Sequence, residues 1–256
     1  MTSTAQTVLI TGAGKGLGKE MALAFASQGY RVAATGKGGI EDTAAEIRNH
    51  GGVAIGIFLD LARADYIEEA VARALAEWGR IDVLVNNASI EGPTAPLVEV
   101  TALEWEETLA INLTGTFLCD RAVAPHMMSR RSGSIIHISS VAGLRAYPLR
   151  APYAVSKWGL IGLTHTLAVE LGSYNVRVNA VCPGPVEGER MSQVIAHRAE
   201  AEGRPIEEVE EEFKRRTALQ RMVSAGDVVG LVLFLASDAA KNITGQAIRV
   251  CAGYGL

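Results

Sequence analysis

Tyr153 and Lys157 are spaced by one helical turn and have side-chain types that can move a proton between them and a ligand. Residues four apart lie on the same face of a helix. A tyrosine with its ordinary pKa of about 10 is a poor base at neutral pH, but a nearby ammonium group favours the phenolate and brings the pKa toward the working range. The pair predicts proton transfer. Taken alone, such a pair is also common among solvent-exposed side chains without a function. The residues around it must therefore decide between a catalytic pair and an ordinary surface pair.

Two further polar positions fit the same chemistry. Ser139 and Ser140 end a strand-like run, and the carboxyl ends of parallel strands face the ligand crevice. We interpret Ser139 as a turn cap and Ser140 as the group that holds the substrate oxygen. Asn112 interrupts an apolar helical stretch, where an asparagine is mildly unfavourable. It is either a surface or kink residue or the anchor of a water in a proton relay.

A glycine-rich segment lies directly between the first strand-like run and the first helical stretch. Its glycines let the backbone turn sharply and approach a pyrophosphate, while the N–H groups at the start of the helix face the anion. Glycines also serve ordinary turns, but the order of strand, loop and helix favours a nucleotide site. We expect the contacts to come from Gly12, Lys15, Gly16, Leu17 and Gly18.

The end of the second strand bears on the choice of cofactor. An NAD site normally places an acidic residue there for the adenosine ribose, whereas this chain has Gly36 followed by Lys37. Lys37 and Lys15 have the charge and the reach for a 2′-phosphate. NADP(H) is therefore favoured, with NAD(H) as the alternative cofactor. The competing interpretation is that both lysines are solvated surface charges.

Short β-branched runs alternate with helix-length stretches, which predicts βαβ units and a parallel sheet. The strand-like runs are Val8–Thr11, Arg31–Thr35, Val53–Phe58, Ile81–Asn86, Ser134–Ser139, Val176–Cys182 and Ala247–Val250. The helical stretches lie near 16–28, 41–50, 64–78, 102–128, 152–172, 187–216 and 225–237. We expect one doubly wound α/β domain over residues 1–256, a Rossmann fold with a mostly parallel seven-stranded sheet.

Local signals mark several boundaries. Capping boxes are predicted at Thr101 to Glu104 and at Ser224 to Asp227, and Gly79 follows a helix end where a left-handed residue is needed. Residues 187–216 are rich in Glu and Arg and are broken by a glycine and a proline. They predict an insertion of two short helices.

Composition restricts the class of function. With 48% apolar residues, 20% charged residues and a net charge of −4, the chain is typical of a globular protein and has no electrostatic footprint for nucleic acid or an anionic membrane. The apolar run 228–236 is far too short for a bilayer. The N-terminus shows no secretion signal, so we expect a cytoplasmic protein.

Cysteine and histidine usage points away from disulfides and metals. The three cysteines form no C-x-x-C pair and are expected to be reduced, partly buried thiols. The five histidines lie far apart, without the H-x-x-x-H or H-E-x-x-H spacing of a metal site, so no metal is expected.

Together these positions resemble the short-chain dehydrogenase/reductase family, in particular its 3-oxoacyl reductase-like subgroup, over essentially the whole chain. The matching residues, in order, are Thr11, Gly12, Gly16, Gly18, Asp60, Asn86, Asn87, Ala88, Asn112, Ser140, Tyr153, Lys157, Pro183 and Gly184. The resemblance implies a catalytic tetrad. In it Tyr153 is the general acid/base and Ser140 binds the carbonyl or hydroxyl oxygen. Lys157 holds the nicotinamide ribose and lowers the tyrosine pKa, while Asn112 anchors a water chain.

The resemblance also implies cofactor contacts outside the glycine loop. Asp60 would contact the adenine amine, Leu61 and Asn87 would line the adenosine side, and Val186 would contact the nicotinamide amide. Ser89 departs from the family pattern, because it replaces the usual glycine after Asn-Asn-Ala. It adds a small hydroxyl beside the cofactor, which we expect to be tolerated.

The segment at about 186–221 is expected to cover the substrate. Apolar residues repeat there at helical spacing and should face inward: Met191, Val194, Ile195, Ile206, Val209 and Phe213. Residues 207–212 are then a solvated acidic face. Further wall residues are Ile90, Val141, Leu144 and Tyr147, which are mostly apolar. No arginine cluster is clearly aimed at a carboxylate or phosphate, although Arg145 and Arg150 could face one.

The helical stretch 152–172 is apolar around most of its circumference. One sheet face cannot bury all sides of a helix, so a subunit interface is expected, with stretch 102–128 beside it. The family resemblance implies a homotetramer.

The expected substrate is a small-molecule alcohol or ketone, and three alternatives stay open. The first is a 3-oxoacyl thioester reductase. The second, a non-catalytic nucleotide sensor, would tend to lack part of the tetrad. The third, a methyltransferase, usually has an acidic residue where Gly36 stands.

Overall fold

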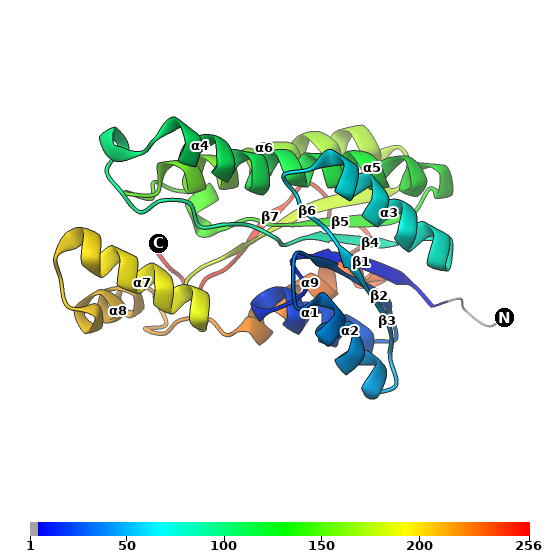
Figure 1. Ribbon diagram of the computed structural model, residues 1–256, viewed down its shortest axis with the longest axis horizontal. Helices are drawn as coiled ribbons and strands as arrows, with labels where there is room; N and C mark the ends of the chain where they lie inside the picture. Colours follow the sequence, from blue (N-terminus) through cyan, green and yellow to red (C-terminus); the bar gives the residue numbers. More distant parts are fainter. Residues whose placement is uncertain (1–4) are drawn as a thin grey trace.

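A seven-stranded sheet forms the centre of the computed structural model, which describes residues 5–256 (Figure 1). Its order is β3-β2-β1-β4-β5-β6-β7, and every neighbouring pair is parallel. The strands are β1 (Thr7–Thr11), β2 (Arg31–Gly36), β3 (Val53–Phe58), β4 (Val83–Asn86), β5 (Gly133–Ile138), β6 (Val176–Pro183) and β7 (Ala247–Val250). The order reverses between β1 and β4, as in a doubly wound sheet. The expected Rossmann fold is confirmed.

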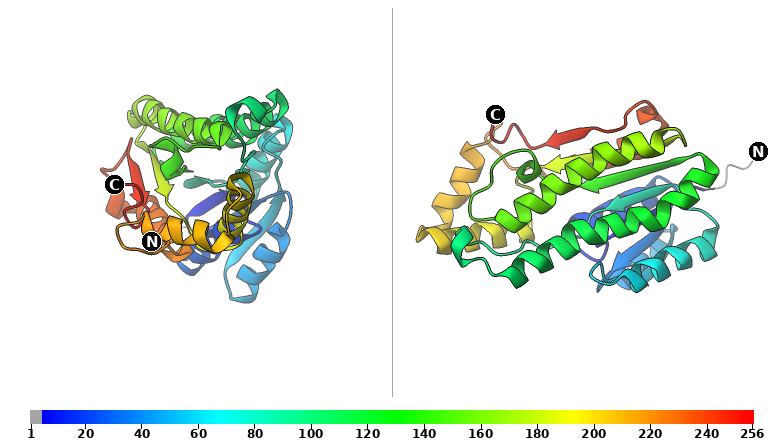
Figure 2. Two further views of the ribbon diagram at one scale, coloured as in Figure 1. Left: turned by 90° about the vertical axis from the view of Figure 1, so that its left-hand side faces the viewer. Right: turned by 90° about the horizontal axis from the view of Figure 1, so that it is seen from above.

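Helices cover both faces of the sheet (Figures 1 and 2). One face carries α1 (Gly16–Ser27), α2 (Ile40–Asn49) and α9 (Ala225–Ala236). The other carries α3 (Ala64–Trp78), α4 (Ala102–Leu109), α5 (Gly115–Arg130) and α6 (Ala151–Gly172). Strands covered on both faces must be apolar throughout, and β1 and β4 are buried along their whole length.

Both predicted capping boxes are present. The Thr101 and Ser224 side chains accept hydrogen bonds from the N–H groups three residues later, and Glu104 and Asp227 bond back. Gly79 ends α3 in the left-handed region at φ 69°. Local side-chain chemistry therefore sets these boundaries.

The expected helix over 102–128 is present, but a π-helical turn, Ala110–Thr114, interrupts its α-helical hydrogen bonding and divides it into α4 and α5. The turn contains Asn112, which is buried and bonded to the backbone of Ile90. The π-helical turn thus coincides with a buried amide whose hydrogen-bond partners lie outside the helix, and such turns are frequent at functional sites.

The insertion consists of α7 (Glu189–Glu202) and α8 (Ile206–Arg215), which lie beyond the carboxyl ends of the strands (Figure 1). Gly203 separates them at φ 63°. Ile195, Val209 and Phe213 are buried in one cluster as expected, but the inward placement of Ile206 is wrong. As the first residue of α8 it extends past that cluster and is 50% exposed.

In residues 5–256, none of the helices has the length and apolar character needed to cross a membrane.

Candidate functional site

The carboxyl ends of β1, β4, β5 and β6 meet along one edge of the sheet, and most of the predicted residues lie there. β1 leads into the glycine loop, β5 leads to Ser140, and β6 leads to Val186. Helix α6 packs against β6 and against the short turn Val141–Gly143 after β5. This packing brings Tyr153 and Lys157 to the same edge.

Tyr153 is surrounded by positive charge. Lys157 Nζ lies 5.5 Å from its ring centroid and Arg150 Cζ lies 5.0 Å from it. Burial alone would raise the pKa of Tyr153, but Lys157, Arg190 and Arg150, with a hydrogen bond to Ser140, hold it below its ordinary value. The surroundings favour the phenolate by the electrostatic effect that the spacing predicts.

Lys157 is buried at 2% exposure, and its ammonium group donates to the Ile138 carbonyl at 2.9 Å. Burial lowers the pKa of Lys157 to about 8, with a smaller contribution from Arg190, although Tyr153 acts in the opposite direction. The side chain is therefore mainly a cation at neutral pH, directed toward the end of β5.

The structure reverses the expected capping roles of the two serines. Ser140 caps the turn after β5, because its Oγ accepts from the Ala142 N–H at 3.1 Å. Ser139 Oγ instead donates to the Lys157 carbonyl at 3.0 Å. The interpretation of Ser139 as the cap is wrong, because its side chain points into the packing between β5 and α6. Ser140 caps the turn, and its hydroxyl also contributes to lowering the pKa of Tyr153.

Asn112 is buried at 1% exposure, and its side chain is fully engaged. Its Oδ1 accepts from the Ile90 N–H at 2.8 Å, and its Nδ2 donates to the Ile90 carbonyl at 2.9 Å and to Ser156 Oγ at 3.2 Å. Ser156 in turn donates to the Tyr153 carbonyl at 2.7 Å. Asn112 therefore ties the segment after β4 to the first turns of α6, and the surface interpretation is wrong.

Two glycines of the loop have little or no room for a side chain. Gly12 is left-handed at φ 68°, and a Cβ on it would lie 3.0 Å from Ala88. A Cβ on Gly18 would overlap the Gly12 carbonyl oxygen and lie 2.6 Å from Asn87 Nδ2. The loop and the start of α1 thus need bare backbone at both positions.

Asn87 and Thr11 hold this loop in place. Asn87 Nδ2 donates to the Thr11 carbonyl at 2.9 Å and to the Gly12 carbonyl at 3.3 Å. Thr11 Oγ1 accepts from the N–H groups of Asn87 and Ala88 at 2.9 and 3.0 Å. Sequence reasoning gave Thr11 no role, although its place at the end of β1 was a usable signal.

The N-terminus of α1 is open to an anion. Its N-cap residue, Lys15, makes no side-chain capping bond, and the first turn of the helix contains no acidic residue. Helices α4 and α9 differ, because both have capping boxes. Lys15 and Gly16 are exposed and Leu17 is half-buried. Free N–H groups at a helix start suit a pyrophosphate.

Lys37 and Asp60 form an ion pair at 2.9 Å at the ends of β2 and β3. Burial alone would raise the pKa of Asp60, but Lys37 and the Ala62 N–H hold it below its ordinary value. The lysine side chain is 63% exposed. Leu61 is buried beside Gly115 of α5.

Val186 is fixed on the far side of the site. It forms a parallel bridge with Val223, supported by the hydrogen bond from the Glu187 N–H to the Val223 carbonyl at 2.9 Å. It is half-buried where the chain leaves β6 for α7.

Arg190 is a site residue that the sequence gave no reason to select. Its Nη1 donates to Ser89 Oγ at 3.1 Å, and its charge lowers the pKa of Tyr153. The extra hydroxyl of Ser89 thus lies against the first turn of α7.

The three cysteines are free and buried. Residues 5–256 contain no group of three or more His, Cys, Asp or Glu side chains placed to hold a metal ion.

This chain is similar to several known proteins over nearly its whole length. A family model described as enoyl-(acyl carrier protein) reductase matches residues 12–255. A 3-oxoacyl-[acyl-carrier-protein] reductase of Synechocystis sp. is 39% identical over 254 residues, covering 98% of this chain and 97% of the relative. The solved structure of NAD+-bound xylitol dehydrogenase has a TM-score of 0.95 at 28% identity, covering 98% of this chain and 100% of that one. That of an actinorhodin polyketide ketoreductase with NADPH has a TM-score of 0.94 at 33% identity, covering 100% and 99%.

Proposed function

Because this chain belongs to the short-chain dehydrogenase/reductase family and is an NAD(P)-dependent oxidoreductase acting on CH–OH groups, we propose that it interconverts a secondary alcohol and a ketone, with Tyr153 as the general acid/base. One observation carries the proposal. Lys157 and Ser140 help to lower the pKa of Tyr153, which lies at the sheet edge that also holds the glycine loop.

The residues present fit a dinucleotide. Gly12 and Gly18 are places where any Cβ would collide, and the α1 N-terminus is uncapped. Gly12, Lys15, Gly16, Leu17 and Gly18 would hold the pyrophosphate.

The remaining cofactor contacts follow the order of the strands. Asp60, Leu61 and Asn87 would lie beside the adenosine. Lys157 would bond the nicotinamide ribose, and Val186 would contact the nicotinamide amide. When bound, the nicotinamide accepts hydride from the alcohol or supplies it to the ketone.

In the reduction direction, the Tyr153 hydroxyl gives its proton to the oxygen that becomes the alcohol. Ser140 donates a hydrogen bond to the same oxygen and holds the carbonyl in place. Lys157 stabilises the phenolate left behind. Asn112 keeps the start of α6 in position through Ser156 and Ile90, and a water on its main chain would return the proton from solvent.

NADP(H) is the favoured cofactor, with NAD(H) as the alternative. Gly36 ends β2 without a carboxylate for the ribose, and Lys37 lies next to it with an exposed ammonium group. A 2′-phosphate would share Lys37 with Asp60, because the lysine already pairs with that carboxylate.

A second candidate is reduction of a 3-oxoacyl thioester. The Synechocystis relative, at 39% identity, bears that activity in its name. Turnover of coenzyme A or acyl-carrier thioesters faster than free ketones would favour this candidate.

We also infer a homotetramer in the cytoplasm, with residues 186–221 covering the substrate. Helices α5 and α6 lie side by side (Figure 2) and expose large apolar side chains: Phe117, Val155, Trp158 and Val169. An exposed apolar surface of this kind is typical of a subunit interface. The expectation that α6 is buried on all sides would then hold only in the assembly.

The variant Tyr153→Phe tests the proposal. It keeps the ring and the packing but removes the proton, so we expect less than a few per cent of wild-type turnover with unchanged NADPH affinity. The assay is cofactor absorbance at saturating ketone, with NADPH titration by fluorescence as the folding control. Retention of a substantial fraction of the activity would refute the assigned role.

A further inference from the structure

A cavity of about 70 Å³ lies between the segment 145–150 and helix α7, and one of its lining residues, Arg150, lies over the Tyr153 ring. One water needs roughly 15 Å³ of such space, so the cavity has room for a carboxylate or a phosphate. Three buried polar atoms on its lining residues have no hydrogen-bond partner among residues 5–256: Thr94 Oγ1, Arg145 Nη1 and Arg150 Nε. Buried polar groups are normally satisfied, so this concentration of donors indicates a ligand.

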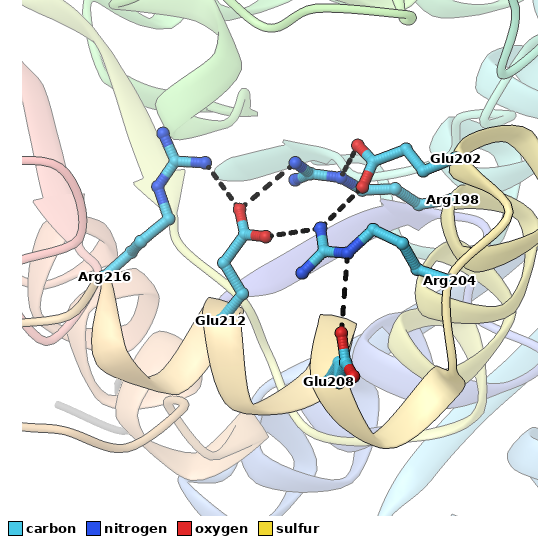
Figure 3. A network of polar contacts seen from close by, with 6 residues as sticks. All are labelled: Arg198, Glu202, Arg204, Glu208, Glu212 and Arg216. Carbon is cyan, nitrogen blue, oxygen red and sulfur yellow. Dashed lines mark hydrogen bonds and ion pairs between the residues drawn. The ribbon is translucent and has the colours of Figure 1, made fainter.

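The charges around the cavity do not balance. Arg198, Glu202 and Arg216 also line it, but they belong to the network in Figure 3, in which three arginines face three glutamates: Arg198, Arg204 and Arg216 against Glu202, Glu208 and Glu212. The prediction of a solvated acidic face is therefore wrong for Glu212, which is 23% exposed and joins all three arginines.

Arg145 and Arg150 are the uncompensated charges. Within residues 5–256 neither forms an ion pair, and each guanidinium instead lies over a ring, Arg145 over Tyr254 at 5.3 Å and Arg150 over Tyr153 at 5.0 Å. Arg150 is only 4% exposed. A buried guanidinium without a carboxylate is costly unless an anion joins it.

The backbone holds Arg150 in this place at a conformational cost. Leu149, the preceding residue, has φ 64°, a left-handed conformation that costs a leucine about 1 kcal/mol or more. The Ala95 N–H fixes this turn by donating to the Leu149 carbonyl at 2.9 Å. Arg150 Nη2 then donates to the Glu91 carbonyl at 2.9 Å. The strained backbone at Leu149 thus lies directly before the residue whose guanidinium lines the cavity and lies over the Tyr153 ring.

We propose that this cavity binds an anionic group of the substrate, so that the substrate is a ketone or secondary alcohol carrying a carboxylate or phosphate a few bonds from the reacting carbon. The inference rests on the proposed function, because it takes Tyr153 as the group that meets the reacting oxygen. Arg150 and Arg145 grip the anion, and Thr94 donates to it. A 3-oxoacyl thioester has a neutral group at that distance and would leave both arginines unpaired.

The test compares matched charged and neutral substrates. NADPH-dependent reduction is measured for keto acids with the ketone β, γ or δ to the carboxylate, each beside its methyl ester, and for dihydroxyacetone phosphate beside dihydroxyacetone. We expect kcat/KM to favour the charged member of at least one pair by roughly 10- to 100-fold, the effect of a charged hydrogen bond. The better pair identifies carboxylate or phosphate.

Variants assign the effect to the cavity. Arg150→Gln and, separately, Arg145→Gln should reduce the charged-to-neutral ratio by roughly tenfold or more. Arg190→Gln is the matched control, because Arg190 also lowers the pKa of Tyr153 but does not line the cavity; its ratio should stay unchanged. Arg145 is half-buried, so its variant remains informative if the Arg150 variant fails to fold.

The failures are distinguishable. If kcat/KM for each neutral ketone equals that for its charged partner, the anion site is overturned. The oxidoreductase proposal is then left standing. The anion site is also overturned if Arg190→Gln loses the charged-to-neutral ratio of kcat/KM while the Arg150 and Arg145 variants keep it. That result would place the anion beside Arg190. Turnover of no ketone or alcohol with either cofactor overturns both proposals.

Discussion

Replacing Lys157 by methionine removes a buried charge from beside Tyr153 while keeping much of the side-chain volume. Nζ lies 5.5 Å from the tyrosine ring centroid, and at an effective dielectric constant of about 20 a unit charge at that distance stabilises the phenolate by about 3 kcal/mol. We therefore expect the pKa of Tyr153 to rise in Lys157→Met.

The direction of the kinetic effect follows from the role of the tyrosine. Alcohol oxidation needs the phenolate as base, so its rate increases as pH rises through the pKa of Tyr153. Raising that pKa moves the acidic limb of the profile to higher pH. The assay is kcat/KM for alcohol oxidation against pH, with phenolate absorbance of the cofactor-free protein as a second measurement.

Lys157→Arg is the matched control, because it retains the positive charge, and its limb should stay within about one pH unit of wild type. A Lys157→Met protein that folds, by circular dichroism, and shows the wild-type limb would refute the electrostatic argument. Arg150 and Arg190 would then be the cations that lower the pKa.

Three further changes have defined outcomes. Lys37→Ala should lower the kcat/KM ratio of NADPH to NADH by about three- to tenfold, because a charged contact is lost at an exposed position; an unchanged ratio contradicts the 2′-phosphate assignment. Gly18→Ala should weaken cofactor binding, measured by fluorescence, and destabilise the fold by about 1–3 kcal/mol through overpacking. Gly172→Ala, at an open helical position, should instead be neutral or stabilising by up to about 1 kcal/mol. Asn112→Ala leaves the Ile90 backbone groups unpaired and should reduce the free energy of unfolding, measured in urea, by about 2–3 kcal/mol. A loss below about 0.5 kcal/mol would contradict the structural role of Asn112.

The layers of the fold were predictable because most strands are rich in buried apolar residues and several helices have a local start or stop signal. Periodicity alone did not predict the π-helical turn around Asn112. The turn coincides with tertiary hydrogen bonds between Asn112 and Ile90, which lies 22 positions away. Ile206 shows the same limit, since the correct helical period does not tell where the packing surface ends.

The candidate site was predictable where one local segment contains both the residues and the reason for them. The glycine loop and the pair of Tyr153 and Lys157 are of this kind. The salt bridge between Lys37 and Asp60 joins the ends of two strands, so the sequence suggested each residue but not their contact. Arg190 lowers the pKa of Tyr153 because the tertiary structure brings the first turn of α7 to Ser89. No local sequence pattern marks this residue.

The ion-pair network of α7 and α8 is closed on itself, because its charges come from one contiguous stretch that ends just after α8. The hairpin is also anchored from outside the network, because Ile195, Val209 and Phe213 pack in one buried cluster with Val141 and Tyr254. Arg198, Glu202 and Arg216 take part in the network and also line the cavity. In this architecture the same side chains stiffen the cover and face whatever enters beneath it, so selection for a new substrate at these positions would also alter the rigidity of the cover.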